Sequence, residues 1–279
     1  MALIEPGDLD IRALARDVVG EFREHQLLIA AGGIAFRVLL ATVVGTLFIT
    51  GALGFFGLEE VWSSDIAPDL RNSVSDAAFR VINDAVTYVL DNKSLFWVTI
   101  GAGIAIWQLS GVVRASGQTL NKIYDVEEKR SLAEEVWNSI KVAAAAAVLL
   151  LATLCVVRLG PLALDDVLGD SAVARVIGFV VRWAIAAALL AVAVGMVVRS
   201  APAIKRPLRW VSFGSALTVA GWIISSILYG LYLSVFASFG SVYGVLLSTF
   251  LLIEYLYVAA IVFLGGLAVD RLVQRRSGG

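Results

Sequence analysis

The chain has 279 residues, of which 59% are hydrophobic and 16% are charged, and its mean hydropathy is +0.86. Soluble domains carry about a quarter charged residues, so this composition excludes an ordinary soluble domain and indicates a surface largely solvated by lipid. The formal net charge of -1 offers no basic excess for a polyanion, and nucleic acid is therefore not an expected partner.

The first 26 residues form one amphipathic segment. Apolar side chains between Ile11 and Phe22 recur at helical spacing, with arginine and aspartate on the opposite face. The segment contains no apolar stretch followed by a small-residue cleavage site, so we expect no cleavable signal peptide. It predicts a helix that lies along the cytoplasmic surface of a membrane.

Six apolar stretches then follow, each long enough for the roughly 20 helical residues that cross a bilayer core. We predict an all-α, polytopic fold with six transmembrane helices in one domain, residues 27–270. The first and last stretches exceed the required length, and glycines up to Gly57 predict irregular backbone at the end of the first. The predicted spans are residues 27–57, 95–113, 139–160, 176–198, 211–236 and 242–270.

Two connections and the C-terminus carry their own patterns. Residues 114–138 are polar and predict a solvated cytoplasmic helical hairpin, and residues 271–279 predict a cytoplasmic tail. Residues 65–90 predict an amphipathic helix on the outer face of the membrane. Its expected apolar face consists of Ile66, Leu70, Val74, Ala78, Val81, Ala85 and Val89.

The orientation follows from the basic residues, because loops rich in lysine and arginine stay in the cytoplasm. Fifteen of the 22 lysine and arginine residues lie in the N-terminal segment, in the connections after the second and fourth spans, or at the C-terminus. Five lie in the segments on the other side. Both termini are therefore expected in the cytoplasm.

Residue types that carry catalysis are scarce. His25 is the single histidine and lies beside Glu24 at a membrane edge, where we expect a solvated surface residue. Cys155 is the single cysteine and lies in an apolar run, where a small apolar group is expected. The sequence has neither the His and Cys cluster of a zinc site nor a phosphate-binding loop. We expect no catalytic, cofactor-binding or metal site, and no enzyme.

The informative residues are charges within the spans, where an ion costs at least about 2.5–3.5 kcal/mol unless it is paired or hydrated. Arg182 is near the outer end of its span and can extend to the surface. Arg37 is about 15 Å from the inner end of its span, and Glu254 is about 18 Å from the outer end of its own. These matched depths predict an ion pair between them, and Gln108 is a further candidate for the same polar site.

Two roles remain open for Arg37 and Glu254. They could form a structural clamp between the first and last spans, sealed among packed helices. Alternatively, they could line a hydrated cavity in which an anionic headgroup or a proton competes for Arg37. The sequence supports both readings.

Three stretches share their order and spacing with a known family. They are residues 30–36 (AAGGIAF), the polar connection 113–130, and the last span, where VYG at 242–244 precedes YLY at 255–257 and LG at 264–265. In these features the chain resembles the YihY/BrkB family of bacterial inner-membrane proteins, once called ribonuclease BN.

The chain also departs from the family's usual residues, as a divergent member would. Arg37 stands where the family usually has an aromatic residue, and Glu254 stands where it has an apolar one. The other departures are Ala41 for serine, Val44 for proline, Tyr255 for tryptophan and Leu267 for glutamate.

The resemblance implies a multi-pass protein of the bacterial cytoplasmic (inner) membrane that moves lipid or another amphiphile between leaflets, or that maintains the envelope. A transporter or flippase is the leading hypothesis, and a non-transporting scaffold or envelope-integrity protein is the alternative. Membrane enzymes rank third. Ribonuclease activity is disfavoured, because RNA hydrolysis needs metal-bound water or a reachable acid/base pair. Membrane lipids are the expected partners, with a second copy of the chain or another envelope protein as further candidates.

Overall fold

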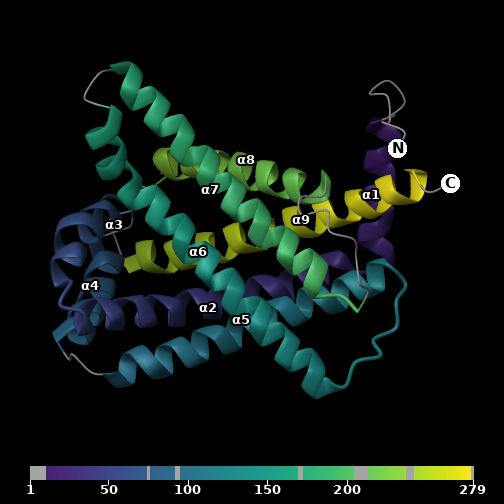
Figure 1. Cartoon of the computed structure of the whole chain (residues 1–279), viewed down its shortest axis with the longest axis horizontal. Helices are drawn as coiled ribbons and strands as arrows, with labels where there is room; N and C mark the ends of the chain where they lie inside the picture. The colour runs from purple at the N-terminus through teal and green to yellow at the C-terminus, as the bar shows by residue number, and fades with distance from the viewer. Residues whose placement is uncertain are drawn as a thin grey trace. The chain divides into compact units, whose positions relative to one another are not determined.

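The computed structural model describes residues 11–73, 76–91, 95–168, 172–203, 213–236 and 242–277. Within these ranges every regular element is helical, as Figure 1 shows. Several features predicted above lie outside the described residues. They are the first ten residues of the amphipathic segment, Val74 of the predicted apolar face, and the basic residues Lys205, Arg206 and Arg209.

Six of the described helices are long and apolar enough to cross a membrane, which confirms the predicted fold class. The cytoplasmic position of both termini stays a prediction. The six are α2 (Leu27–Phe55), α5 (Leu95–Ile123), α6 (Leu132–Leu168), α7 (Ala172–Ser200), α8 (Phe213–Phe236) and α9 (Val242–Ser277).

Four of these helices, α5, α6, α7 and α9, run past their predicted ends. Helix α5 continues beyond residue 113 to Ile123, so residues 114–123 of the predicted hairpin extend the second span. Helix α9 continues beyond residue 270 to Ser277. Arg271 therefore belongs to a helix, and the cytoplasmic position of residues 271–279 stays a prediction.

The remaining elements are shorter. Helix α1 (Ile11–Glu24) precedes α2, and a π-helix η1 (Val61–Ile66) leads into α3 (Ala67–Ser73) and α4 (Asp76–Asp91). The break between α1 and α2 is a short turn in which Gln26 has a φ of 51°. Its N–H donates to the Arg23 carbonyl, and its own carbonyl accepts from Ile29 at 3.1 Å, so one helix ends and the next begins at the same residue.

The chain divides into two compact units. Unit 1 combines residues 1–30, 113–222 and 261–279, and unit 2 combines residues 31–112 and 223–260. Each unit is built from segments far apart in the sequence, because both contain parts of α2, α5, α8 and α9. The boundaries of a single domain at 27–270 stay a prediction.

Unit 1 contains a close crossing of α8 and α9. A Cβ atom at Gly214 would lie 2.6 Å from Cβ of Asp270, and one at Gly266 would overlap the hydroxyl of Thr218. Small residues let two helix backbones approach in this way. Asp270 is buried, and its carboxylate accepts a hydrogen bond of 3.4 Å from the Gly214 N–H, one of the free donors in the first turn of α8.

Unit 2 has its own apolar cluster around Trp62, whose indole N–H donates to the Asn83 side chain at 3.1 Å. The face that α4 turns to this cluster agrees only in part with the predicted one, since Val89 is buried as expected. Val81, expected on the apolar face, is 64% exposed. Ile66 and Leu70 of the predicted face also pack on the cluster. The α4 side chains packed in the cluster are Phe79, Ile82, Val86 and Leu90.

The irregular backbone predicted at the end of the first span is present. Gly57 has a φ of 69°, a conformation that glycine adopts without steric cost. The N–H of Leu58 donates to the Leu53 carbonyl at 2.8 Å, and the N–H of Gly57 donates to the Gly54 carbonyl at 3.3 Å. This is a Schellman motif, which satisfies carbonyls that the end of α2 would leave free.

Candidate functional site

The predicted intramembrane residues are divided between the two units. Arg37 on α2, Gln108 on α5 and Glu254 on α9 belong to unit 2, whereas Arg182 on α7 belongs to unit 1. Arg37 and Glu254 are both exposed, and Gln108 is half-buried. Among the residues that the structure describes, no ion pair is recorded between Arg37 and Glu254. The pairing stays a prediction.

Arg37 lies directly against helix α5. A side chain at Gly111 would overlap the Arg37 guanidinium, so the absence of a Cβ atom there makes room for the cation. Gln108 is one turn earlier on α5, on the same side as Gly111. Ser110 is fully buried, and its hydroxyl donates to the Trp107 carbonyl at 2.7 Å, so its polar group is satisfied within the helix.

Glu254 lies on α9 next to Tyr255, which packs on Tyr229 of α8. The rings of Tyr229 and Tyr255 are 5.0 Å apart at their centroids, with 42° between their planes. The hydroxyls of Tyr255 and Ser226 are 2.9 Å apart and hydrogen-bonded. Polar groups are thus concentrated where these two helices meet within unit 2.

Arg182 has a different environment. Its guanidinium carbon is 5.7 Å from the centroid of the Phe179 ring, one turn earlier on α7. Its Cδ would be 3.2 Å from a Cβ atom at Gly160, so the aliphatic stem packs closely on α6. An apolar stem covered by helix and ring, with the charge carried to its end, is the arrangement that lets a basic side chain reach a membrane surface.

A second polar site was not predicted, and its centre is Arg271 in unit 1. Arg271 is only 4% exposed. Its Nη1 donates to Oε2 of Glu21 at 2.9 Å, and its Nη2 donates to Oδ2 of Asp125 at 2.7 Å. The Nε2 of His25 is 3.0 Å from the same Nη1. We call these four residues the arginine cluster. It joins α1, the end of α5 and α9.

The structure differs from the expectation for His25 at this cluster. His25 was expected to be solvated, but its side chain is 11% exposed and its Nε2 is 3.1 Å from Oε2 of Glu21. The segment 114–138 has helix on both sides of a turn, as a hairpin does, but Leu120 and Ile123 are fully buried within it. The i,i+4 spacing of Glu21 and His25 was a usable signal. Arg271 gave none, because nothing local links it to residues about 250 positions earlier.

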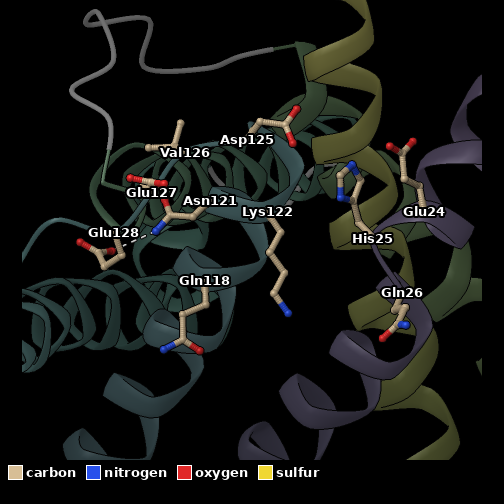
Figure 2. Close-up of a pocket in the computed structure, with 10 residues that line it drawn as sticks. All are labelled: Glu24, His25, Gln26, Gln118, Asn121, Lys122, Asp125, Val126, Glu127 and Glu128. Carbon is tan, nitrogen blue, oxygen red and sulfur yellow. Dashed lines mark hydrogen bonds between the residues drawn. The ribbon is translucent and has the colours of Figure 1, made fainter.

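A pocket of about 720 Å³ adjoins the arginine cluster, and two members of the cluster, His25 and Asp125, line it. Figure 2 shows Glu24 and His25 on one side, Glu127 and Glu128 on the other, and the Lys122 side chain between them. Most of the charged groups on its walls are carboxylates. The lining residues are Glu24, His25, Gln26, Gln118, Asn121, Lys122, Asp125, Val126, Glu127 and Glu128.

One wall of the pocket is held by an ion pair. Both oxygens of Glu128 accept hydrogen bonds of 2.7 Å from Arg130, and Asn121 donates to the same carboxylate at 2.9 Å. The hydrogen bonds from Arg130 are the largest cause of a pKa of about 2 at Glu128, well below the ordinary 4.5. Glu128 is therefore ionised at neutral pH, and Arg130 balances its charge.

The same ion pair caps the end of α7. Arg130 donates to the Ala201 carbonyl at 2.9 Å, and Asn121 accepts from the N–H of Ala203 at 2.9 Å. A cation at a helix C-terminus satisfies a free carbonyl and interacts favourably with the helix dipole. Gly117 permits this approach, since a Cβ atom there would lie 2.6 Å from the Ala201 oxygen.

No group of three His, Cys, Asp or Glu side chains within the described ranges is placed to hold a metal ion. The six candidate spans, with polar residues both at helix ends and within spans, define a polytopic α-helical membrane protein.

The comparisons identify the family. A family model described as "Virulence factor BrkB" matches residues 18–279, and the chain belongs to this family. The resemblance drawn from the sequence is confirmed. The chain is also similar to "Putative ribonuclease-like protein YfkH" of Bacillus subtilis (strain 168), with 24% identity over 265 residues that cover 94% of this chain and 95% of that protein. No solved structure matches.

Proposed function

We propose that this BrkB-family protein moves a lipid or another amphiphile between the two leaflets of a membrane. One observation carries the proposal: Arg37 and Glu254, which lie within long apolar helices, are both exposed. A charge that faces hydrocarbon costs at least about 2.5–3.5 kcal/mol, so exposed charges at these positions are stable where water or a lipid headgroup meets them.

The alternative, a non-transporting scaffold, makes a different demand on the same residues. A structural clamp needs both charges sealed among packed helices, because a buried ion pair stabilises only when it is well coordinated. Arg37 instead rests in the space left by Gly111 with its side chain accessible. This geometry supports transport over the scaffold.

The surroundings suit an amphiphile better than a small hydrophilic solute. The residues next to the two charges are large, apolar and exposed: Phe36 is 61% exposed and Ile253 is 44% exposed. A substrate whose headgroup meets the charge can keep its acyl chains in contact with this apolar surface. Arg37 would then contact the phosphate or another anionic group of the lipid headgroup.

We further propose that the membrane is the bacterial cytoplasmic membrane and that both termini face the cytoplasm. The excess of lysine and arginine in the N-terminal segment and in alternate connections supports this orientation. The similarity to a Bacillus subtilis protein supports the bacterial setting.

The proposal is tested in proteoliposomes with fluorescent phospholipids and a membrane-impermeant quencher. Wild type is expected to expose inner-leaflet label faster than empty vesicles do, and Arg37→Gln and Glu254→Gln are expected to slow this step. Lys141→Gln removes an exposed charge from α6 and serves as the matched control. If the folded wild type gives the rate of empty vesicles with every lipid class, the transport proposal is wrong and the scaffold is favoured.

A further inference from the structure

The single histidine of the chain, His25, is placed at the junction between α1 and α2. Its N–H donates to the Glu21 carbonyl at 3.1 Å, so its backbone continues the last turn of α1. The helix is interrupted at the next residue, Gln26, which has a φ of 51°. His25 and Glu21 therefore move together when α1 moves about this turn.

Three side-chain atoms of the arginine cluster meet at one point. Nη1 of Arg271 donates to Oε2 of Glu21 at 2.9 Å. Nε2 of His25 is 3.1 Å from the same oxygen and 3.0 Å from Nη1. Two nitrogens from different helices thus approach one carboxylate oxygen and also each other.

The charge of His25 decides whether this arrangement is favourable. A neutral imidazole with its proton on Nδ1 accepts a hydrogen bond through Nε2, so Arg271 can donate to both His25 and Glu21. An imidazolium is a donor at both nitrogens and has no acceptor. After protonation, the 3.0 Å contact would join two cations without an acceptor between them, and both would compete for Oε2 of Glu21.

The direction of the effect depends on which charges accompany His25. Glu21 is on the same helix, so it attracts a proton on His25 whether or not α1 is attached to α9. Arg271 opposes that proton only in the attached state. Burial acts in the same sense, because the His25 side chain is 11% exposed and a cation is better solvated by water. Acid therefore favours the detached state of α1.

The other charges near His25 do not reverse this direction. Glu24 is on α1 and moves with it. Lys122 and Asp125, from the end of α5, line the adjacent pocket and carry opposite charges, so their effects on His25 oppose each other. Asp125 also accepts the 2.7 Å hydrogen bond from Nη2 of Arg271, which gives Arg271 a partner when it leaves Glu21.

The pocket gives His25 access to water and would change with α1. Glu24, His25 and Gln26 form the wall of the pocket at the end of α1, as Figure 2 shows. Besides the ionic contacts, the Phe22 ring packs over Gly265 of α9, since a Cβ atom there would be 3.8 Å from it. Movement of α1 away from α9 would therefore open the pocket on that side.

We propose that His25 makes the attachment of α1 sensitive to pH. Protonation of its ring displaces Arg271 from Glu21, and α1 moves away from α9 and opens the pocket. Histidine is the side chain whose charge ordinarily changes between about pH 5 and 8, so the contact would respond to mild acidification. This inference is independent of the proposed lipid transport.

The test is hydrogen exchange measured by mass spectrometry on the full chain in lipid nanodiscs, purified without a histidine tag. Exchange is compared at about pH 7.5 and about pH 5.5, with each rate corrected for the intrinsic effect of pH. The protection of α1 amides in wild type is expected to fall about tenfold at the lower pH. Helix α7 is the internal reference and should keep its protection.

Three variants separate the charge of His25 from its packing. His25→Gln keeps an acceptor for Arg271 and cannot be protonated, so α1 should stay protected at both pH values. His25→Lys carries a permanent cation and should leave α1 unprotected at both. Asp125→Asn changes the acid that bonds the other nitrogen of Arg271, so this matched control should keep the wild-type response to pH.

Equal corrected protection of α1 in wild type at the two pH values would overturn the proposal, as would a fall that folded His25→Gln retains. Ring nitrogen signals in NMR spectra provide a second measurement that needs no variant, because they report one histidine. An imidazolium at about pH 5.5 together with the loss of α1 protection supports the proposal. A neutral ring at that pH overturns it.

Discussion

The ends of α2 and α5 close with the same hydrogen-bond pattern but with different residues in the left-handed position. After α2, Gly57 occupies it with a φ of 69°. After α5, Asp125 occupies it with a φ of 52°, its N–H donating to the Lys122 carbonyl and the N–H of Val126 donating to the Asn121 carbonyl at 2.9 Å. Both are Schellman motifs, in which glycine is the usual residue.

The difference between Gly57 and Asp125 shows what each position requires of its residue. A residue with a Cβ atom is less stable than glycine in this conformation by roughly 1–2 kcal/mol, although aspartate tolerates it better than most. At position 57 only the left-handed backbone conformation requires glycine. Asp125 bears a steric cost, and its carboxylate accepts the 2.7 Å hydrogen bond from Arg271. The end of α5 thus serves an ionic contact as well as a turn.

The largest expected effect comes from removing Arg271, the arginine that donates a hydrogen bond to Asp125. Arg271→Met would leave the Glu21 carboxylate, whose side chain is 7% exposed, without its cation. Breaking a buried pair in this way typically costs about 3–5 kcal/mol, so we expect a large fall in the thermal unfolding midpoint. The double variant Glu21→Gln with Arg271→Met should regain part of the loss. Full additivity in that double-mutant cycle would show that the two residues are not coupled.

The next effect sharpens the glycine side of the comparison. Gly57→Ala should destabilise the protein by about 1–2 kcal/mol, because alanine disfavours the left-handed conformation. No atom lies within 4 Å of the added Cβ, so the cost is one of backbone conformation and not of overlap. Gly45→Ala is the matched control, since Gly45 is within α2 and also has open space around it. Equal unfolding midpoints for the two variants would contradict the role given to Gly57.

A smaller effect is expected at Asp125 itself, because its side chain is 70% exposed and exposed ion pairs contribute up to about 1 kcal/mol. Asp125→Asn removes the charge and keeps a residue that accepts a left-handed φ, so it should lower stability slightly. Asp125→Gly also loses the contact but relieves the backbone, so it should be more stable than Asp125→Asn. Chemical unfolding of both variants measures the difference. If Asp125→Asn were instead more stable than Asp125→Gly, the left-handed conformation at residue 125 would carry no steric cost.

The smallest expected effect is a pH dependence in the loop that follows Asp125. The pKa of Glu128 is lowered from 4.5 to about 2 by Arg130, so the folded state binds its proton less readily than the unfolded chain does. The stability from this ion pair is therefore present above about pH 4.5 and is lost as the pH falls towards 2. Glu128→Gln should flatten the decline of the unfolding midpoint in that window. Wild type and variant declining in parallel would rule out this contribution.

The features that the sequence predicted are those with a local pattern. Apolar runs of sufficient length defined the spans, and the glycines after residue 44 indicated the backbone break that occurs at Gly57. Arg37 and Glu254 could be singled out because an ion within an apolar run is costly wherever its partners are. Their predicted pairing depends on contacts between distant helices, which periodicity does not encode.

The arginine cluster could not be predicted for the same physical reason. Asp125 resembled one more acid in a polar loop, and Arg271 resembled the first residue of a basic tail, because neither is surrounded by apolar sequence on both sides. Only the packing of α1, α5 and α9 within unit 1 buries Arg271 and gives it two carboxylates. Aspartate at position 125, in place of the usual glycine, indicates an ionic contact only once the Schellman geometry is known.

The adjacent residues Asp270 and Arg271 determine how α9 can move. Successive side chains on an α-helix point about 100° apart, so one of these residues holds α8 while the other holds α1 and the end of α5. Turning α9 about its own axis would break both attachments at once. This end of α9 is therefore held against rotation by its contacts with α8, α1 and the end of α5.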